Sequence, residues 1–326
     1  NVAAAETLIK HGANVNARET WREQTALMWA AAQNQPAMTK LLVQRGADVN
    51  ARSAVNDWPR QVTGEPRRMY RPFGGLTPLL FAAREGCMMC ARTLVEGGAN
   101  VNLTDPKGVT PLFLAIDNLH FDLAKYLIEK GANPNKWDWW GRTPLYSAVD
   151  VNTLPHGGRP DRPSTDATSG LEVIERLLKA GAWPNVQLKL LQPFRHIGDD
   201  RGCDLMLTTG MTPLLRAARG GDDKFTALLL EFKALVDLPS KEGITPLMLA
   251  LDNEHNEVAK FILDKGANFD VWDWWGRTAL WIAVDRKPSP AAGAGPLGGG
   301  FGGAGAAKGG GQAKGGPGAG KGGGKQ

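Results

Sequence analysis

The sequence contains few cysteines and no long apolar segment. Only three of its 326 residues are cysteine, which is too few for a disulfide framework and leaves the redox compartment open. No run of about 18 apolar residues occurs, so no membrane span is predicted. The chain starts at Asn1 rather than Met and has no signal-like segment. We therefore expect a fragment or processed chain that is soluble and either cytoplasmic or exported.

Excess charge is also missing from most of the chain. The formal charge is +5, but four lysines lie within residues 288–326, where no acid occurs, so 5 − 4 leaves +1 for the rest. This balance favours neither nucleic acid nor an acidic membrane as a partner. Residues 288–326 are mostly Gly, Ala, Pro and Lys. We expect them to form a flexible tail or a truncated insertion, and to act as a linker rather than a weak RNA-binding segment.

Signatures of catalysis and cofactor binding are scarce. The five histidines do not group, and the sequence has no H-x-x-x-H motif, no Cys/His zinc spacing and no phosphate-binding glycine loop. We therefore expect no enzyme activity, no metal and no cofactor. Cys87 and Cys90 form a C-x-x-C that could be a redox pair or half of a metal site. Because no second C-x-x-C accompanies it, we interpret the pair as small core and turn residues, which an oxidising compartment could join.

What the sequence does contain is a repeat. A Thr-Pro-Leu or Thr-Ala-Leu triplet recurs at Thr25, Thr77, Thr110, Thr143, Thr212, Thr245 and Thr278, with several intervals of 33 residues. Threonine is a good helix N-cap, and proline suits the first helical turn. After Thr110, an apolar run predicts a short first helix, and apolar residues near 3.6-residue spacing predict a second. Gly131 would end that helix, because glycine adopts the left-handed conformation at low cost.

The pattern T-P-L-x-x-A-A, a short turn, a leucine-rich helix and G-A-N-V-N resembles the ankyrin repeat, whose period is also 33 residues. The resemblance covers residues 1–287 and implies an all-α solenoid of helix–turn–helix units with short β-hairpin fingers and a concave groove. We expect a partial unit at 1–24, units from residues 25, 77, 110, 143, 212 and 245, and the first helix of a last unit at 278–287. His120 and His255 occupy a position where the family commonly has a structural histidine.

A longer repeat is superimposed on the short one. Thr77, Thr110 and Thr143 each recur 135 residues later, and 25 of the 41 positions in 110–150 are identical in 245–285. A block of three units is therefore duplicated in the sequence. Three insertions rich in Pro, Gly, Arg or Asp interrupt the period, at 53–75, 152–169 and 188–210. They are predicted to be surface loops, either on a binding face or as tolerated decoration.

The segment Trp-Asp-Trp-Trp-Gly-Arg occurs at 137–142 and again at 272–277. By the resemblance it is a hairpin finger, with Asp138 at the turn, Gly141 closing it, and two tryptophans at the tip. Trp and Arg are frequent interface hot spots. The candidate partner contacts are Trp139, Trp140 and Arg142 in the first copy and Trp274, Trp275 and Arg277 in the second. The alternative is that these rings pack on a neighbouring finger or insertion.

A row of polar residues recurs at the end of the predicted first helices. The row contains Asp117, Asp150, Asp252 and Asp285, with Asn118 and Asn253 after two of them and Arg84 and Arg219 at the same position in two other units. In ankyrin repeats this position faces the concave groove, where partners commonly dock. We therefore expect recognition of a partner, with hydrogen bonds between repeats as the main alternative. Catalysis would need two acids about 5–10 Å apart, and nothing else supports it.

These observations predict a monomeric, non-catalytic scaffold that binds protein partners through the groove and the fingers. The duplicated block suggests two similar half-sites, and so a repetitive or dimeric partner. One alternative is the targeting part of a larger enzyme or effector whose catalytic domain lies outside this chain. Another is carbohydrate binding, because Trp–Asp pairs can stack on sugars and hydrogen-bond to them.

Overall fold

The computed structural model describes residues 1–56, 59–60, 69–70, 72–153, 164–189 and 209–285. The predicted tail at 288–326 lies outside these residues, as do parts of all three insertions. Nearly all regular secondary structure in these residues is α-helix.

Threonine and proline start the first helix of most repeats. The hydroxyl oxygen of Thr110 accepts a hydrogen bond from the N–H of Phe113 at 3.1 Å, and Thr245 accepts one from Met248 at 3.3 Å. The following proline needs no such partner because it has no N–H. The first helices are α2 (Ala26–Ala32), α4 (Pro78–Glu85), α6 (Pro111–Asp117), α8 (Pro144–Thr153), α10 (Pro213–Gly220), α12 (Pro246–Asp252) and α14 (Ala279–Asp285).

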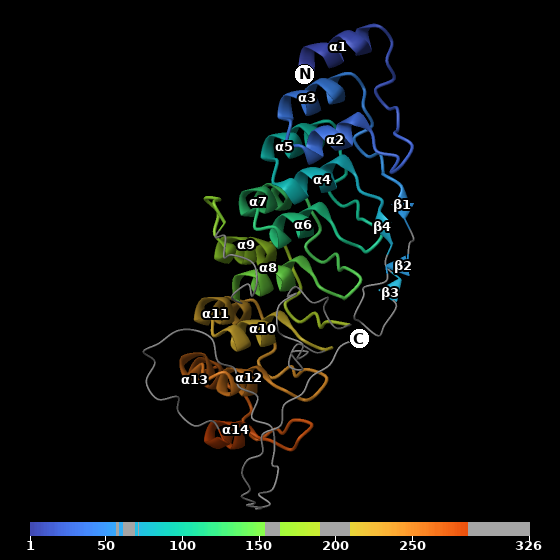
Figure 1. Cartoon of the computed structure of the whole chain (residues 1–326). Helices are drawn as coiled ribbons and strands as arrows, with labels where there is room; N and C mark the ends of the chain where they lie inside the picture. Colours follow the sequence, from blue (N-terminus) through green and yellow to red (C-terminus); the bar gives the residue numbers. More distant parts are fainter. Residues whose placement is uncertain (57–58, 61–68, 71, 154–163, 190–208, 286–326) are drawn as a thin grey trace, which may run out of the picture. The chain divides into compact units, whose positions relative to one another are not determined.

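A second helix folds back on each first helix, except that α14 has none among the described residues. The second helices are α1 (Val2–Lys10), α3 (Pro36–Gln44), α5 (Met88–Glu96), α7 (Phe121–Glu129), α9 (Gly170–Lys179), α11 (Asp223–Glu231) and α13 (Asn256–Asp264). First helices pack on first helices and second helices on second helices, which gives two parallel rows in the unit that spans Asn1–Arg286 (Figure 1). The prediction of an all-α ankyrin solenoid is confirmed.

Leucines of the Thr-Pro-Leu triplets form the core between the rows. Leu79, Leu112, Leu145, Leu214 and Leu247 are all buried. Each contributes roughly 1.5–3 kcal/mol of transfer free energy relative to an exposed side chain. The core therefore repeats along the chain, because the triplet repeats.

Helix α8 is longer than predicted. We expected Asp150 to end it, as Asp117, Asp252 and Asp285 end their helices, but α8 continues to Thr153. The side chains of Asn152 and Thr153 donate to the carbonyls of Ala148 and Val149, at 2.7 and 2.8 Å. These side-chain bonds occupy carbonyl groups at the helix end, which is where the second insertion leaves the repeat.

Asparagines tie consecutive repeats together beyond the helices. Asn102 donates from Nδ2 to the carbonyl of Gly131 at 3.1 Å and accepts from the N–H of Asn133 at 2.7 Å. The same paired bonds are made by Asn16, Asn50, Asn135 and Asn185. We call this series the asparagine ladder. Because its bonds join the turns after second helices, it fixes the spacing of the repeats independently of the apolar core.

The first insertion contains strands rather than only a loop. Strand β1 (Val55–Asn56) pairs antiparallel with β4 (Phe73–Gly74), and β2 (Pro59–Arg60) pairs antiparallel with β3 (Met69–Tyr70). In the β1–β4 pair, the β-branched Val55 and the aromatic Phe73 favour strand formation. The predicted fingers, in contrast, are tight turns, and two of them carry an isolated bridge, Arg18 with Thr25 and Trp272 with Thr278.

The duplicated histidines cap second helices and connect units. His120 precedes α7 and its Nε2 lies 3.2 Å from the carbonyl oxygen of Arg84, while His255 precedes α13 and lies 3.0 Å from that of Arg219. A Cβ at Gly86 would lie 2.5 Å from the His120 ring, so this position requires glycine. The histidines therefore have a structural role.

The C-x-x-C forms a buried disulfide at the start of α5. The sulfur atoms of Cys87 and Cys90 are 2.00 Å apart, and Cys87 Sγ also accepts from the N–H of Cys90. In the second block the equivalent N-cap is Asp222, whose carboxylate accepts from the N–H of Phe225 at 2.8 Å. The Cys87 sulfur and the Asp222 carboxylate thus each accept a hydrogen bond from a backbone N–H in the first turn of the equivalent helix.

Candidate partner-binding surface

Each Trp-Asp-Trp-Trp-Gly-Arg finger is organised by its buried aspartate. Asp138 Oδ1 accepts from the N–H groups of Trp140 and Arg142, at 3.0 and 2.9 Å, and Oδ2 accepts from Arg142 Nε at 2.8 Å. The N–H of Gly141, which has φ of +81°, donates back to the Asp138 carbonyl at 2.9 Å. One side chain therefore fixes the whole turn.

The second finger repeats this turn. Asp273 Oδ1 accepts from the N–H groups of Trp275 and Arg277 at 2.9 Å each, and Oδ2 accepts from Arg277 Nε at 2.7 Å. The finger also bonds to the preceding one, because the N–H of Trp274 donates to the carbonyl of Glu242 at 2.8 Å. The equivalent bond in the first finger runs from Trp139 to Lys107 at 2.7 Å.

The two tips differ in what they expose. In the first finger Trp139 is 51 % exposed, but Trp140 is only 5 % exposed because the chain at Leu188–Lys189 covers it. The carbonyl of Trp140 accepts from the N–H of Lys189 at 3.1 Å. In the second finger both tip tryptophans are exposed, Trp274 at 81 % and Trp275 at 55 %. Trp140 thus packs internally, whereas the other three can reach a partner.

Further tryptophans lie on the same edge of the repeats. Trp137 and Trp272 precede the two aspartates and are exposed, and Trp21 is exposed in the first finger of the chain. Cations stack on several of these rings: Arg22 on Trp21 at 4.5 Å, Lys189 on Trp137 at 4.2 Å and Arg277 on Trp275 at 5.1 Å. We call the exposed set the finger surface: Trp137, Trp139, Trp272, Trp274 and Trp275.

Arg142 is buried beneath the first finger. Its Nη1 lies 3.6 Å from Asp117 Oδ2, and its guanidinium stacks on the Phe113 ring at 4.7 Å. Burial disfavours the charged form of Arg142, but the carboxylates of Asp117 and Asp138 outweigh this effect and raise the pKa of Arg142. Arg142 therefore positions the finger. Its counterpart Arg277 is more open, with 23 % of its side chain exposed.

The polar row at the first-helix ends is largely used within the array. Ser147 Oγ donates to Asp117, and Arg216 Nε donates to Asp150 at 2.6 Å, with both Arg216 and Asp150 buried. Desolvation, strengthened by the Asp150 charge, raises the pKa of the neighbouring Tyr146. Asp117 and Asp150 thus make hydrogen bonds between repeats, which was the alternative to groove recognition.

Other members of the row are more accessible. Arg84, Asn118 and Asp285 are exposed, whereas Arg219, Asp252 and Asn253 are half-buried. Asn118 and Asn253 each donate from Nδ2 to a carbonyl of their own first helix at 2.8 Å, those of Leu114 and Leu249. These two side-chain amides therefore cap the C-terminal ends of their helices and also remain at least partly exposed.

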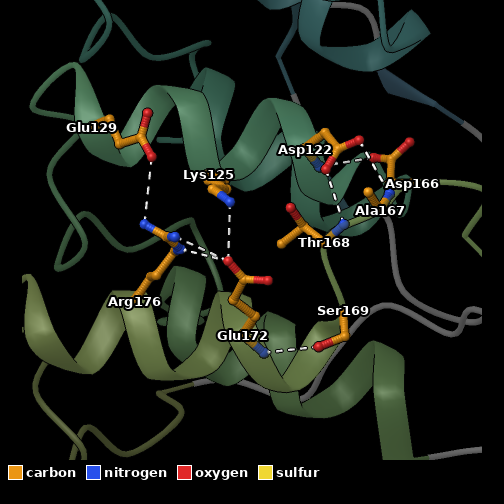
Figure 2. Close-up of polar contacts among 9 residues, drawn as sticks. All are labelled: Asp122, Lys125, Glu129, Asp166, Ala167, Thr168, Ser169, Glu172 and Arg176. Atoms are coloured by element: carbon orange, nitrogen blue, oxygen red, sulfur yellow. Dashed lines mark hydrogen bonds and ion pairs between the residues drawn. The ribbon is translucent and has the colours of Figure 1, made fainter.

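A polar contact between α7 and the segment that leads into α9 was not anticipated from the sequence (Figure 2). Asp122 accepts from the N–H groups of Ala167 and Thr168 at 3.2 and 3.0 Å, and its own N–H donates to Asp166 at 2.8 Å. These bonds, first those from Thr168, lower the pKa of the Asp122 carboxyl. The contact anchors the end of the second insertion on the preceding repeat.

The same interface continues along the two helices. Glu172 accepts from Lys125 at 3.1 Å and from Arg176 at 3.0 Å, and Arg176 also pairs with Glu129 at 3.4 Å (Figure 2). These ion pairs are exposed enough that each contributes about 0–1 kcal/mol. The only sign of this interface in the sequence is the i, i+4 pair Glu172–Arg176. Such a pair can form within a single helix, so it does not indicate which other helix lies beside it.

Metal and membrane features can be assessed only for the described part of the chain. Within it, no group of three or more His, Cys, Asp or Glu side chains could hold a metal ion. No described helix combines the length and the apolarity that crossing a bilayer requires.

Comparison with known proteins agrees with the geometry. The family described as ankyrin repeats (3 copies) matches residues 1–53, 63–138, 79–155, 166–273 and 233–291. Over 106 residues the chain is 35 % identical to ankyrin repeat and SOCS box protein 6 of Homo sapiens, and 33 % identical to that of Mus musculus. Each match covers 32 % of this chain and 21 % of the relative, so the chain spans about a fifth of these proteins. With the repeats matched over most of its length, this chain belongs to the ankyrin repeat family, whose members are protein-interaction scaffolds.

Proposed function

We propose that this array binds a protein partner through the finger surface. The observation that supports this most strongly is Trp139. It lies in the interior of the array, with repeats on both sides, yet half of its side chain is exposed. Its backbone is fixed by the bond to Lys107 and by the buried Asp138. An indole held in this way loses little conformational freedom on binding and can bury a large apolar area.

In this proposal, accessible polar residues form the rim of the interface. Arg277 and the exposed members of the first-helix row, Arg84, Asn118 and Asp285, would make rim contacts. Trp140, Arg142, Asp117 and Asp150 would act indirectly, by holding the fingers and helices in place. Aromatic anchors with a polar rim are typical of protein interfaces.

The test is the double variant Trp139→Ala with Trp274→Ala. We expect at least about a tenfold loss of captured partner in cross-linking pull-downs, because buried interface tryptophans contribute roughly 2 kcal/mol or more. Trp183→Ala is the matched control, since Trp183 is equally exposed but follows a second helix. Circular dichroism verifies the fold. Unchanged capture by the folded double variant would refute the proposal, and selective binding on a glycan array would favour a carbohydrate ligand instead.

A second proposal is that the array is the recognition part of a larger protein. The relatives' names join ankyrin repeats with a SOCS box, and this chain matches only a fifth of their length. The complete reading frame tests this: a second functional domain encoded with the array supports it, and an array encoded alone contradicts it.

A further inference from the structure

A groove of about 660 Å³ lies between α2, α4 and the strand pair β1–β4. Its aromatic walls are Trp29, Phe73 and Phe81, and its polar lining includes Gln33, Asn56 and Arg84. Phe81 is nearly buried, whereas Trp29 is 52 % exposed. The groove thus has an apolar floor and an accessible aromatic side.

The equivalent positions between α8 and α10 are occupied by buried polar residues. Counting from the capping threonines, Trp29 corresponds to Ser147 and Phe81 corresponds to Arg216. Both of these polar residues are fully buried. Ser147 donates to Asp117, and Arg216 donates to Asp150 at 2.6 Å. At these two positions the chain therefore has hydrogen-bonded polar residues in one pair of repeats and aromatic rings in the other.

The outer wall of the groove is preformed by the first insertion. Val55 pairs with Gly74 and Asn56 with Phe73 across β1 and β4. Gly74 has φ of +90°, and a Cβ there would lie 1.9 Å from the carbonyl oxygen of Ala54, so only glycine lets the strands approach. Lys107 Nζ stacks 4.0 Å from the Phe73 ring centre. These contacts fix Phe73 as part of a rigid wall.

The charges of the groove favour an acidic ligand. Its charged lining residues are Arg22, Arg84 and Glu85, which gives a net charge of +1 from two cations and one anion. Arg84 Nε donates to Glu85 at 2.8 Å, the guanidinium stacks on Phe81, and 44 % of the side chain is exposed. The terminal nitrogens of Arg84 are thereby oriented and can donate to a second carboxylate.

We propose that this groove binds an extended peptide segment of a partner. A large apolar side chain would lie against Trp29 and Phe81, and a neighbouring carboxylate would pair with Arg84. The amides of Gln33 and Asn56 would bond to the peptide main chain. This inference rests on the proposed function as a protein-binding scaffold, but it uses none of the finger-surface tryptophans and shares only Arg84 with the rim of that surface.

The test uses the whole chain and a positional-scanning library of end-blocked heptapeptides. We expect enrichment of peptides with Trp, Phe, Leu or Met within two positions of Asp or Glu. For the best such peptide, Trp29→Ala should weaken binding roughly tenfold. Arg84→Ala should weaken it to a similar degree. That variant should not affect the analogue in which Asn replaces the acid.

Two variants provide matched controls. Trp183→Ala and Arg45→Ala remove an exposed Trp and an exposed Arg outside the groove and should leave binding unchanged. Circular dichroism confirms that each variant is folded.

The groove proposal is overturned if no motif is enriched, if an apolar–basic motif is selected, or if Trp29→Ala binds the best peptide as tightly as the original chain. The finger double variant separates the two proposals. If it loses partner capture while peptides show no groove dependence, the finger surface stands and the groove fails. If it keeps partner capture while groove variants lose the peptide, the reverse holds.

Discussion

The two copies of Trp-Asp-Trp-Trp-Gly-Arg form the same turn, but the second tip tryptophan is buried in one copy and exposed in the other. Asp138 and Asp273 make the same three hydrogen bonds within their fingers. Trp140, however, is 5 % exposed and Trp275 is 55 % exposed. Identical local sequence therefore determines the conformation of the finger, whereas the neighbouring segment determines which side chains remain available.

The first finger packs against one end of the third insertion, at Leu188–Lys189, which is bonded to Met211 at the other end. The N–H of Leu188 donates to the carbonyl of Met211 at 2.9 Å, and both side chains are buried. They share a core cluster with Tyr146 and Ile244. The described residues end with α14 at Asp285, and none of them covers Trp275 in the way that the chain at Leu188–Lys189 covers Trp140. The two fingers thus differ in the exposure of this tryptophan because, within the described residues, a segment distant in the sequence covers it only in the first finger.

The largest expected effect concerns the covered ring. Trp140→Ala should lower the free energy of unfolding by about 4 kcal/mol, because a buried aromatic side chain leaves a cavity. Trp275→Ala should change it by less than about 1 kcal/mol. Chemical denaturation of both variants measures the contrast. Equal losses would show that the two rings have the same environment in solution.

The next largest effect concerns the finger aspartates. Asp138→Ala should cost about 3 kcal/mol, because it removes the nearer of the two carboxylates that pair with the buried Arg142 guanidinium. Asp273→Ala should cost about half as much, since Arg277 can reach water. Urea denaturation at neutral pH compares them, with Asp270→Ala on the exposed surface as the control. A greater loss at Asp273 would contradict this order.

A smaller effect distinguishes Asp122 from its duplicate Glu257. Asp122→Ala should cost about 1 kcal/mol, as for the loss of a helix cap, and Glu257→Ala should cost almost nothing. The folded-state pKa of Asp122 lies below its ordinary value of 3.8. Its contribution is therefore complete above that pH and is lost as the pH falls through the folded-state pKa.

The measurement is the difference in unfolding free energy between the original chain and Asp122→Ala, at pH 7 and at pH 3. The difference should shrink at the lower pH. A difference that grows on acidification would mean that the carboxyl is bound in its protonated form.

The smallest effect concerns the asparagine ladder. In the second block Asp237 replaces Asn102, and it accepts from the N–H of Asn268 at 2.9 Å but has no amide hydrogen to donate. Asp237→Asn should add a bond to the Gly266 carbonyl and stabilise the array by about 0.5 kcal/mol. Thermal unfolding measures the gain, and Asn102→Asp should show a loss of similar size. No gain at Asp237 would mean that water already satisfies this carbonyl.

The sequence predicted the fold because each repeat carries its own signals. Thr110, Pro111 and Gly131 mark helix boundaries by local chemistry, which needs no knowledge of the neighbours. It did not predict that Trp140 is covered or that Asp117 and Asp150 pair internally, because these outcomes depend on which segments meet in space. The strand pair at Val55 and Phe73 was missed for the same reason. Binding by the exposed tryptophans remains a prediction.

The asparagine ladder has a consequence for engineering. Its donor bonds join residues 29 apart in sequence at Asn102, but 46 apart at Asn135 and 48 apart at Asn185, with the same geometry. The rungs keep the same bonds although the intervals between the bonded residues differ. Additional sequence between two rungs would therefore be carried without altering the spacing of the repeats, so the two long intervals are suitable positions for inserting a foreign segment.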